Sequence, residues 1–302
     1  MPTALITGAC GFIGRNLIQK LLRSDYTIVA VDCVDAIHSC YENDPRVTYI
    51  HSDLSDVNSG FDNVPHCDML FHLAWKGVTA EFRSDITVQK KNIDICVNVI
   101  DLAKRLAIPR VIFVGSTMEY CYNEKPICEE SLPTPSNCYG SCKVAARFIC
   151  SQLCADQGIE FEYAVIASIY GKGREDSNVI YYCIKSLLQK KSPDVSSCVQ
   201  LWDYVHIDDA VNALQLIGEK GIPGSFYSIG TGENKPLKYY LSVISSLIDD
   251  SIPINFGAIA QTGNRIANSS VNIQKLTQDT GYKPSYCFSE GIAEVVDYYR
   301  NK

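Results

Sequence analysis

The sequence predicts an α/β fold: a doubly wound parallel sheet with helices on both faces, joined to a smaller α/β lobe toward the C-terminus. Three observations predict it. Short apolar runs rich in β-branched residues alternate with longer helix-like runs through the first half of the chain. A glycine-rich turn joins the first strand run to the first helix run, and an acidic residue closes the second strand run. Together these features describe a βαβ unit of the dinucleotide-binding, or Rossmann, type.

The elements of the first half follow one another in order. The expected strands belong to one sheet that is covered on both faces, and they are Ala4–Thr7, Thr27–Val31, Val47–Ile50, Met69–Leu73, Val111–Val114 and Phe161–Ile166. The expected helices are longer runs, and they are Phe12–Leu22, Ile86–Leu106 and Tyr139–Gln157. We interpret residues 1–170 as the cofactor-binding domain.

The second half, residues 171–302, is less regular and is expected to form the smaller, substrate-binding lobe, with the chain free to cross between the two lobes. Its expected elements are a loop at 192–197, a helix at 206–218, a strand, loop and helix within 224–248, a short strand at 254–257, and a helix at 271–284 that ends at Gly281 and Pro284. Asp208 and Asp209 fall in the first turn of their helix, where the helix dipole favours acids.

Composition excludes several classes of function. The 302 residues carry 27 Lys and Arg against 34 Asp and Glu, a net charge of −7, and no basic stripe that would bind nucleic acid. The apolar runs are too short to span a membrane, and the N-terminus lacks the basic region of a signal peptide. None of the 14 cysteines forms a C-x-x-C pair, so we expect free thiols in a reducing cytoplasm and no metal site.

The turn after the first strand has the spacing of a phosphate cradle. Gly8, Gly11 and Gly14 are three residues apart in TGACGFIG. Gly8 permits a tight turn, Gly11 lets a pyrophosphate approach the backbone, and Gly14 lets the helix pack closely on the strand. The helix N-terminus then offers free N–H groups to the anion. Glycines also punctuate ordinary turns, so the cradle needs the acid that follows it.

That acid is Asp32, at the end of the second strand run and about 20 residues past the glycines, where a carboxylate binds an adenosine ribose. The alternative is a turn residue at a strand end. A carboxylate there repels a 2′-phosphate, and no arginine follows in CVDAIHSC. NAD is therefore favoured over NADP.

A second pattern points to proton transfer. Tyr139 and Lys143 are four residues apart on an expected helix, so they share one face. A neighbouring ammonium lowers the pKa of a phenol, which can then exchange a proton with a substrate hydroxyl. Ser116 and Thr117 end the preceding strand, at the edge where such sheets bind ligands, and one of them is expected to hydrogen-bond the reacting oxygen. The alternatives are an exposed aromatic–cation pair and a turn serine.

Taken together, these residues resemble the extended short-chain dehydrogenase/reductase family, the nucleotide-sugar epimerases, dehydratases and 4-keto reductases. The resemblance covers nearly the whole chain. Its motifs are TGACGFIG, SDLSD, FHLAW, GSTMEYC, YGSCK, LWDYVHIDDAVNAL, YSIGTGENKPLKY and TGYKP. It implies cofactor contacts at Gly8, Gly11, Phe12, Ile13, Gly14, Asp32, Asp53, Leu54, Leu73, Ala74 and Lys143, and catalytic roles for Ser116, Tyr139 and Lys143.

The family also implies a chemistry. Tyr139 removes a hydroxyl proton, usually at C4 of the sugar, while the nicotinamide takes the hydride. The sugar's nucleotide diphosphate binds in the smaller lobe. Family members commonly pair the helices expected at Ile86–Leu106 and Tyr139–Gln157 into a dimer interface, so we expect a homodimer.

Departures from the family pattern narrow the reaction. Dehydratases carry an Asp–Glu pair after the catalytic hydroxyl, where this chain has Thr117 and Met118, with Glu119 one position late. Epimerases that also invert C3 or C5 often have a cysteine where Met118 stands. Both activities are therefore disfavoured. Trp202 replaces the usual phosphate-binding arginine, and the R-x-x-N pattern before VYG is absent.

The substrate contacts that remain are Thr117, Met118, Asn178, Trp202 and Arg265, with Lys172 as a further candidate cation. The favoured function is an NAD-dependent nucleotide-sugar 4-epimerase. The alternative is an NAD(P)H-dependent reductase of nucleotide-linked 4-keto-6-deoxysugars, because residues 254–276 resemble the C-terminal part of CDP-abequose-type reductases. A silent NAD-sensing protein is disfavoured because Tyr139 and Lys143 are both present.

Overall fold

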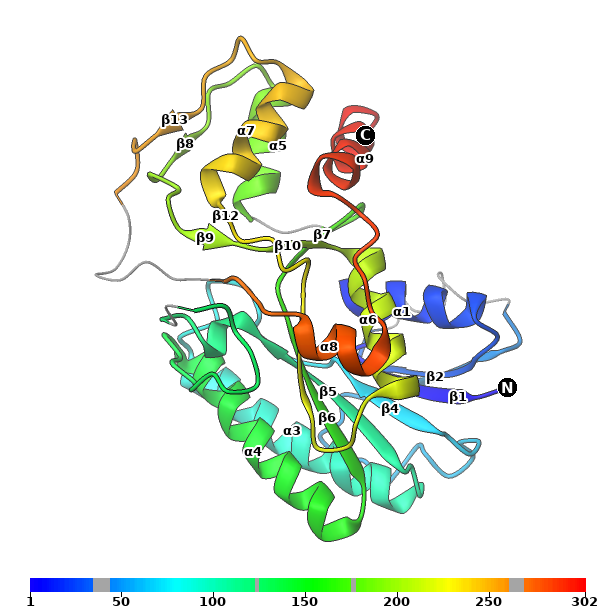
Figure 1. Ribbon diagram of the computed structural model, residues 1–302. Coiled ribbons are helices and arrows are strands. Elements are labelled where there is room, and N and C mark those ends of the chain that lie inside the picture. The colour runs from blue at the N-terminus through cyan, green and yellow to red at the C-terminus, as the bar shows by residue number, and fades with distance from the viewer. Residues whose placement is uncertain (35–43, 123–124, 175–177, 261–268) are drawn as a thin grey trace.

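The computed structural model describes residues 1–34, 44–122, 125–174, 178–260 and 269–302. Its main sheet has seven strands, all parallel, in the order β11-β6-β5-β4-β1-β2-β3 (Figure 1). The strands are β1 (Thr3–Thr7), β2 (Thr27–Asp32), β3 (Val47–His51), β4 (Met69–His72), β5 (Arg110–Ser116), β6 (Glu160–Ile166) and β11 (Phe226–Ile229). This is the predicted doubly wound fold.

The strand order reverses at β1, which has β2 on one side and β4 on the other. Thr7, the last residue of β1, lies opposite Val31 of β2 and His72 of β4. In a parallel sheet this reversal opens a crevice at the carboxyl ends of the strands, where ligands bind. The fold therefore places the glycine turn at its expected binding edge.

Helices cover both faces of the sheet. The helices α3 (Ile86–Arg105) and α4 (Cys138–Gln157) pack side by side on one face, and α1 (Phe12–Arg23) and α6 (Ile207–Lys220) on the other (Figure 1). The Asp85 side chain accepts hydrogen bonds from the first turn of α3 and so caps it. Gly158, in the left-handed conformation, ends α4.

The first-half predictions are confirmed with small changes at the ends. All six predicted strands and all three predicted helices form. The strand predicted to reach Leu73 ends at His72. One second-half prediction is wrong, because residues 192–197 contain the strand β8 (Asp194–Val195), which pairs with β13 (Asn255–Phe256). Its two residues carry too little pattern to be recognised without their distant partner.

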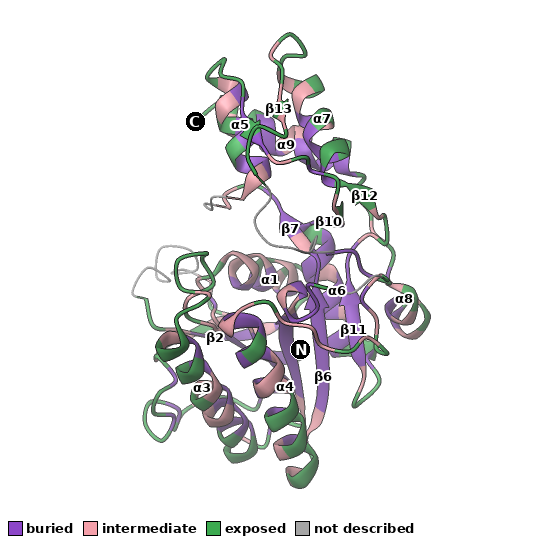
Figure 2. Cartoon of the chain, turned by 90° about the vertical axis from the view of Figure 1, so that its left-hand side faces the viewer, coloured by how far each residue is buried: buried purple, intermediate pink, exposed green. Residues whose placement is uncertain are grey.

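Three segments after residue 170 pack on the larger lobe. The helix α6 lies against α1, the strand β11 is the seventh strand of the main sheet, and α8 (Gln274–Thr280) packs on both α6 and β11. Figure 2 shows β6 and β11 coloured as buried. The chain therefore crosses between its two hydrophobic clusters more than once.

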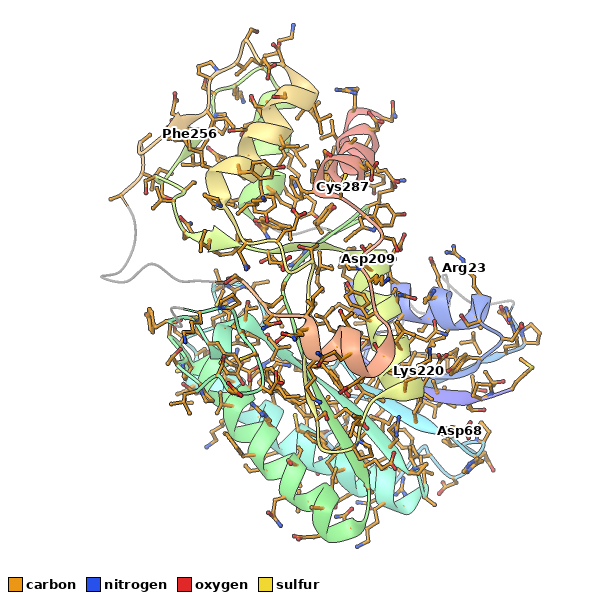
Figure 3. The ribbon with its side chains drawn as sticks, viewed as in Figure 1. Arg23, Asp68, Asp209, Lys220, Phe256 and Cys287 are labelled. Atoms are coloured by element: carbon orange, nitrogen blue, oxygen red, sulfur yellow. The ribbon has the colours of Figure 1, made fainter. Side chains whose placement is uncertain are left out.

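The smaller lobe is built on three helices around an aromatic cluster. Its elements are α5 (Val179–Leu188), α7 (Leu237–Ile248), α9 (Phe288–Arg300), and the short strand pairs β7 (Ser168–Tyr170) with β10 (Tyr204–His206), β9 (Leu201–Trp202) with β12 (Lys235–Pro236), and β8 with β13. Tyr204, Tyr240 and Phe288 meet at its centre. Asp209, labelled in Figure 3, accepts hydrogen bonds from Ser285 N and Tyr286 N and so ties α6 to the segment that leads to α9.

Candidate active site

The glycine turn is shaped by contacts that only glycine allows. Gly8 has a φ of +70°, and a Cβ there would lie 2.8 Å from Ala74 N. A Cβ on Gly14 would lie 2.2 Å from Gly8 O. Gly11 begins α1 with extended backbone, and no side chain in the described structure caps the helix. The first-turn N–H groups, including those of Phe12 and Ile13, are therefore available to an anion, as a bound pyrophosphate requires.

Asp32 joins the second strand to this turn. Its Oδ2 accepts a hydrogen bond from Cys10 N at 2.9 Å, and its Oδ1 accepts one from Cys33 N at 2.7 Å. A carboxylate can accept about four hydrogen bonds, so both oxygens keep capacity for a ribose hydroxyl. The position at the end of β2, beside the glycines, fits the adenosine side of a dinucleotide.

The other predicted cofactor contacts lie on the segments that follow β3 and β4. Leu54 is buried, and its carbonyl accepts a hydrogen bond from Asn98 Nδ2 at 2.9 Å. Asp53 is exposed, and hydrogen bonds from Ser55 lower its pKa. The backbone N–H groups of Leu73 and Ala74 approach Thr7 Oγ1 at 3.2 and 3.3 Å, which places them next to Gly8.

Tyr139 meets Ser116 across the gap between α4 and β5. The Ser116 side chain lies close enough to the Tyr139 hydroxyl to lower its pKa, and the Tyr139 backbone N–H donates to Arg83 O at 2.8 Å. The Tyr139 ring meets the Trp75 ring edge-on, with centroids 5.9 Å apart. Burial raises the pKa of Tyr139 to about 12, and the Ser116 side chain opposes that rise.

Lys143 lies one turn further along α4 and is almost fully buried. Its Nζ donates to Val114 O at 2.7 Å and lies 4.1 Å from the centroid of the Trp75 ring. Burial lowers the pKa of Lys143 to about 8. The expectation that Lys143 lowers the pKa of Tyr139 is wrong for this structure, because desolvation of the phenol dominates and the ammonium is held at the Val114 carbonyl.

The predicted substrate contacts are spread over both lobes. Thr117 and Met118 form the short helix η2 (Thr117–Glu119) beside Ser116. Asn178 caps α5, and Tyr204 Oη donates to its Oδ1 at 3.5 Å. Trp202 Nε1 donates to Ser168 Oγ at 2.6 Å. Arg265 lies outside the described residues.

Lys172 does not serve as a free cation, because its Nζ forms an ion pair with Glu294 of α9 at 2.7 Å. Another cation lies closer to the chemistry. Arg83, between β4 and α3, donates from Nε to Val78 O at 2.9 Å, and its charge lowers the pKa of Tyr139. Sequence reasoning missed Arg83, although its place after a strand that ends at the binding edge was an available signal.

No group of three His, Cys, Asp or Glu residues among those described could hold a metal ion. Within the same residues, no helix combines the length and the apolar character needed to cross a bilayer.

The comparison with known families decides the class of protein. The model of the NAD dependent epimerase/dehydratase family matches residues 4–230. The chain belongs to this family. It is therefore an NAD-dependent enzyme of the extended short-chain dehydrogenase/reductase type, and the glycine cradle and Asp32 are the features of its structure that fit NAD.

Individual relatives are distant but span the whole chain. The UDP-glucose 4-epimerase of Mycolicibacterium smegmatis is 24% identical over 99% of this chain and 98% of its own. The dTDP-glucose 4,6-dehydratase of Streptomyces antibioticus is 22% identical over 98% of this chain and 92% of its own. The crystal structure of UDP-glucuronic acid 4-epimerase from Bacillus cereus, in complex with UDP-glucuronic acid and NAD, has a TM-score of 0.87 at 22% identity over 99% of both chains. These likenesses support the fold and the nucleotide-sugar class, and they leave the reaction open.

Proposed function

We propose that this enzyme is a nucleotide-sugar 4-epimerase. The observation that carries the proposal is the approach of the Ser116 side chain to the Tyr139 hydroxyl, with Lys143 one helical turn away, at the sheet edge that holds the glycine cradle. A phenol and a hydroxyl that lie next to each other can both hydrogen-bond one sugar oxygen. The relatives that are 4-epimerases support this reaction.

The residues divide the work at C4. Tyr139 takes the proton of the C4 hydroxyl, and Ser116 hydrogen-bonds the same oxygen and holds it in place. When bound, NAD would supply the hydride acceptor and a positive ring charge. That charge would favour the phenolate of Tyr139 and so oppose the effect of burial on its pKa. Tyr139 then returns the proton when C4 is reduced again.

The turn after β5 argues against the other reactions of the family. Elimination of water needs an acid and a base beside the sugar, where η2 has Thr117 and Met118. The third residue of η2, Glu119, is fully buried and hydrogen-bonded to Ser116 N and to the Tyr163 hydroxyl. Inversion at C3 or C5 needs an acid–base residue where Met118 stands. We therefore propose a nucleotide-diphosphate sugar as the substrate, with chemistry confined to C4.

A 4-keto reductase remains the second candidate because residues 254–276 resemble that class. The carboxylate of Asp32 opposes it, since such reductases often prefer NADPH and an acid at this position repels a 2′-phosphate. The presence of Tyr139 and Lys143 opposes a silent NAD-binding protein.

Cofactor retention distinguishes the first two candidates. The protein is purified by gel filtration, its NAD content is measured, and a panel of UDP-, CDP-, dTDP- and GDP-sugars is added without further cofactor. An epimerase retains close to one NAD per chain and forms the 4-epimer of one sugar. Loss of NAD on purification, with turnover only after NADH and a 4-keto sugar are added, contradicts epimerisation and identifies the reductase.

We further propose a homodimer formed through α3 and α4. The two helices pack side by side, and α4 exposes Phe148 and Ile149 at 59% and 40%. A second copy would cover these side chains with the same face. Light scattering should give twice the chain mass, and a monomer would contradict the proposal.

We also propose that the enzyme works in the cytoplasm. The cysteines that the structure describes are all free thiols, several of them buried, such as Cys96, Cys150 and Cys154. Such thiols persist in a reducing compartment.

A further inference from the structure

A buried carboxylate lies directly behind the Ser116–Tyr139 pair. Glu119 is the last residue of η2 and is fully buried. Its Oε1 accepts a hydrogen bond from Ser116 N at 2.6 Å, while Ser116 Oγ accepts one from Met118 N at 3.2 Å. These reciprocal bonds form a capping box, which closes the turn that follows β5.

The neighbouring strand holds the same carboxylate. Tyr163 of β6 places its hydroxyl 2.8 Å from both Glu119 oxygens. Gly115 makes room for this contact, because a Cβ on Gly115 would lie 2.5 Å from Tyr163 Oη. Gly115 of β5, Tyr163 of β6 and Glu119 of η2 thus fit one another, and the turn cannot shift without breaking the hydrogen bonds of Glu119.

These bonds fix the orientation of Ser116. Its backbone N–H is bound to Glu119 and one lone pair of its hydroxyl to Met118 N, so the hydroxyl is left to face Tyr139. We propose that Glu119 is a positioning residue, whose buried carboxylate locks the turn that presents the Ser116 hydroxyl to Tyr139 and to the reacting sugar oxygen. The proposal rests on the proposed function, because it gives Glu119 a task in that reaction.

The charge of Glu119 can change near neutral pH. The titratable and charged groups that act on it or are acted on by it are Tyr163 from β6, Tyr139, Lys143 and Arg147 from α4, and the adjacent Tyr120. Burial raises the pKa of Glu119 to about 7, and its hydrogen bonds and the two cations oppose the rise. The ionised form accepts hydrogen bonds more strongly, so the bonds from Ser116 N and the Tyr163 hydroxyl to Glu119 strengthen as pH rises through that value.

Two substitutions of Glu119 should lower kcat to different extents. Glu119→Leu keeps the bulk and removes both acceptors, and it should lower kcat by about 100-fold. Glu119→Gln keeps one acceptor, so it should restore part of the loss and lie about tenfold below wild type, without a rise in kcat around pH 7. The KM for the sugar and the NAD content should not change in either. Wild-type kcat in Glu119→Leu would overturn the proposal.

A double variant tests whether Glu119 acts through Ser116. Ser116→Ala removes the hydroxyl that Glu119 is proposed to aim. Adding Glu119→Gln to Ser116→Ala should then cost nothing more, because the two residues act as one unit. If the factors by which the two single substitutions lower kcat multiply in the double variant, Glu119 acts independently of Ser116, and the proposal is overturned.

Tyr163→Phe offers a matched variant that leaves Glu119 in place. The Tyr163 hydroxyl lowers the pKa of Glu119, so its removal should raise that pKa. The pH at which kcat rises should therefore move upward. An unchanged pH profile of kcat would contradict the proposal that ionisation of Glu119 controls turnover.

A structural readout separates this proposal from the proposed function. In crystals of Glu119→Leu, Ser116 Oγ should turn away from Tyr139, and a Ser116 hydroxyl that keeps its wild-type position would overturn the proposal whether or not a substrate has been found. A difference infrared spectrum, wild type minus Glu119→Gln, should show the carboxylic acid band of Glu119 fading as pH rises through about 7. By contrast, if none of the nucleotide sugars in the panel is turned over, only the proposed function is contradicted.

Discussion

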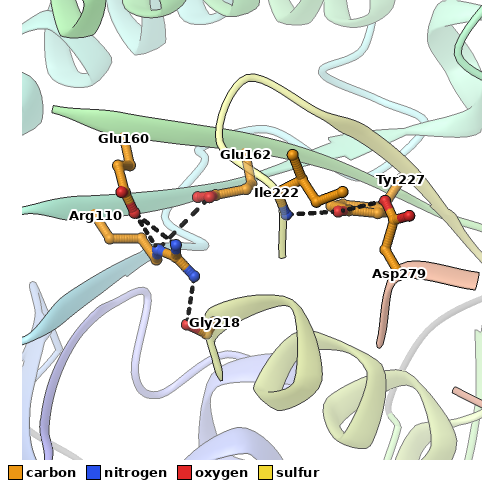
Figure 4. A network of polar contacts seen from close by, with 7 residues as sticks. All are labelled: Arg110, Glu160, Glu162, Gly218, Ile222, Tyr227 and Asp279. Carbon is orange, nitrogen blue, oxygen red and sulfur yellow. Dashed lines mark hydrogen bonds and ion pairs between the residues drawn. The ribbon is translucent and has the colours of Figure 1, made fainter. Parts of the chain in front are cut away.

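Two buried glutamates, one in the turn η2 after β5 and one in the neighbouring strand β6, have very different surroundings. Glu119, at the carboxyl end of β5, accepts hydrogen bonds from Ser116 and Tyr163. Glu162, within β6, forms an ion pair with Arg110 at 3.6 Å, and neither of its oxygens has a hydrogen bond among the described residues (Figure 4). Arg110 is also engaged by Glu160 and by Gly218 O. Burial nevertheless raises the pKa of both glutamates to about 7.

The difference teaches that a raised pKa does not by itself mark a reactive site. Glu119 touches the turn that carries Ser116, and its charge acts on Tyr139 and Lys143. Glu162 is paired with Arg110, which also donates to Gly218 O of α6. This pair lies away from the carboxyl ends of the strands, where the glycine turn lies. Position relative to the carboxyl edge of the sheet separates function from packing.

The largest expected effect is at the carboxyl edge itself. Tyr139→Phe removes the proton acceptor and should lower kcat by about 1,000-fold, since general base catalysis contributes on the order of 10²–10⁴. NAD content should remain near that of wild type. Tyr182→Phe, at an exposed tyrosine of α5, is the control. Near-normal turnover of Tyr139→Phe would show that the site at the carboxyl edge does not carry out the proton transfer, and the contrast between Glu119 and Glu162 would lose its functional meaning.

Asp32→Ala should act on the cofactor and spare the proton transfer. Without the carboxylate, the ribose loses a charged acceptor worth about 1.5–3 kcal/mol, so NAD affinity should fall by about tenfold or more. Discrimination against NADP should relax, because the 2′-phosphate is no longer repelled. Titration with both cofactors measures the two effects, and an unchanged preference would show that Asp32 does not face the ribose.

Arg83→Gln should act on the substrate. The diphosphate of a nucleotide sugar is anionic, and Trp202 stands where the family usually has its arginine. If Arg83 supplies the missing charge, KM should rise by about tenfold while kcat changes little. Arg105→Gln, at the far end of α3, is the matched control. An unchanged KM would exclude Arg83 from substrate binding.

Glu162→Gln should have the smallest effect on turnover and a clear effect on stability. The folded protein holds the Glu162 proton more tightly than the unfolded chain, so wild type loses stability as pH rises from 4.5 to about 7. Glutamine removes that loss, which is at most about 3 kcal/mol for a shift of this size. Denaturant unfolding at pH 5 and pH 8 measures it. If Glu162→Gln altered kcat, or kept the wild-type pH dependence of stability, Glu162 would not differ from Glu119 in the proposed way.

The sequence predicted what depends on neighbours along the chain. The glycine spacing, Asp32, and the pair Tyr139 and Lys143 are local patterns, and the structure brings them to one sheet edge. The strand that became β11 was predicted but assigned to the smaller lobe, because its pairing with β6, about 60 residues earlier, leaves no trace in the local pattern.

The rest depends on contacts that no local pattern reveals. Glu119 and Tyr163 are 44 residues apart, so only the register of β5 and β6 brings them together. The sign of the shift in the pKa of Tyr139 was missed because it depends on burial, which the spacing of Tyr139 and Lys143 does not report.

The central claim is tested most directly by following the hydrogen on C4. The purified enzyme, without added cofactor, is incubated with its nucleotide sugar labelled with deuterium at C4, and the products are examined by NMR and mass spectrometry. A 4-epimerase should yield both epimers with deuterium still at C4, because the same hydride is removed and returned. Loss of deuterium from C4, or no second epimer from any nucleotide sugar, would contradict the account.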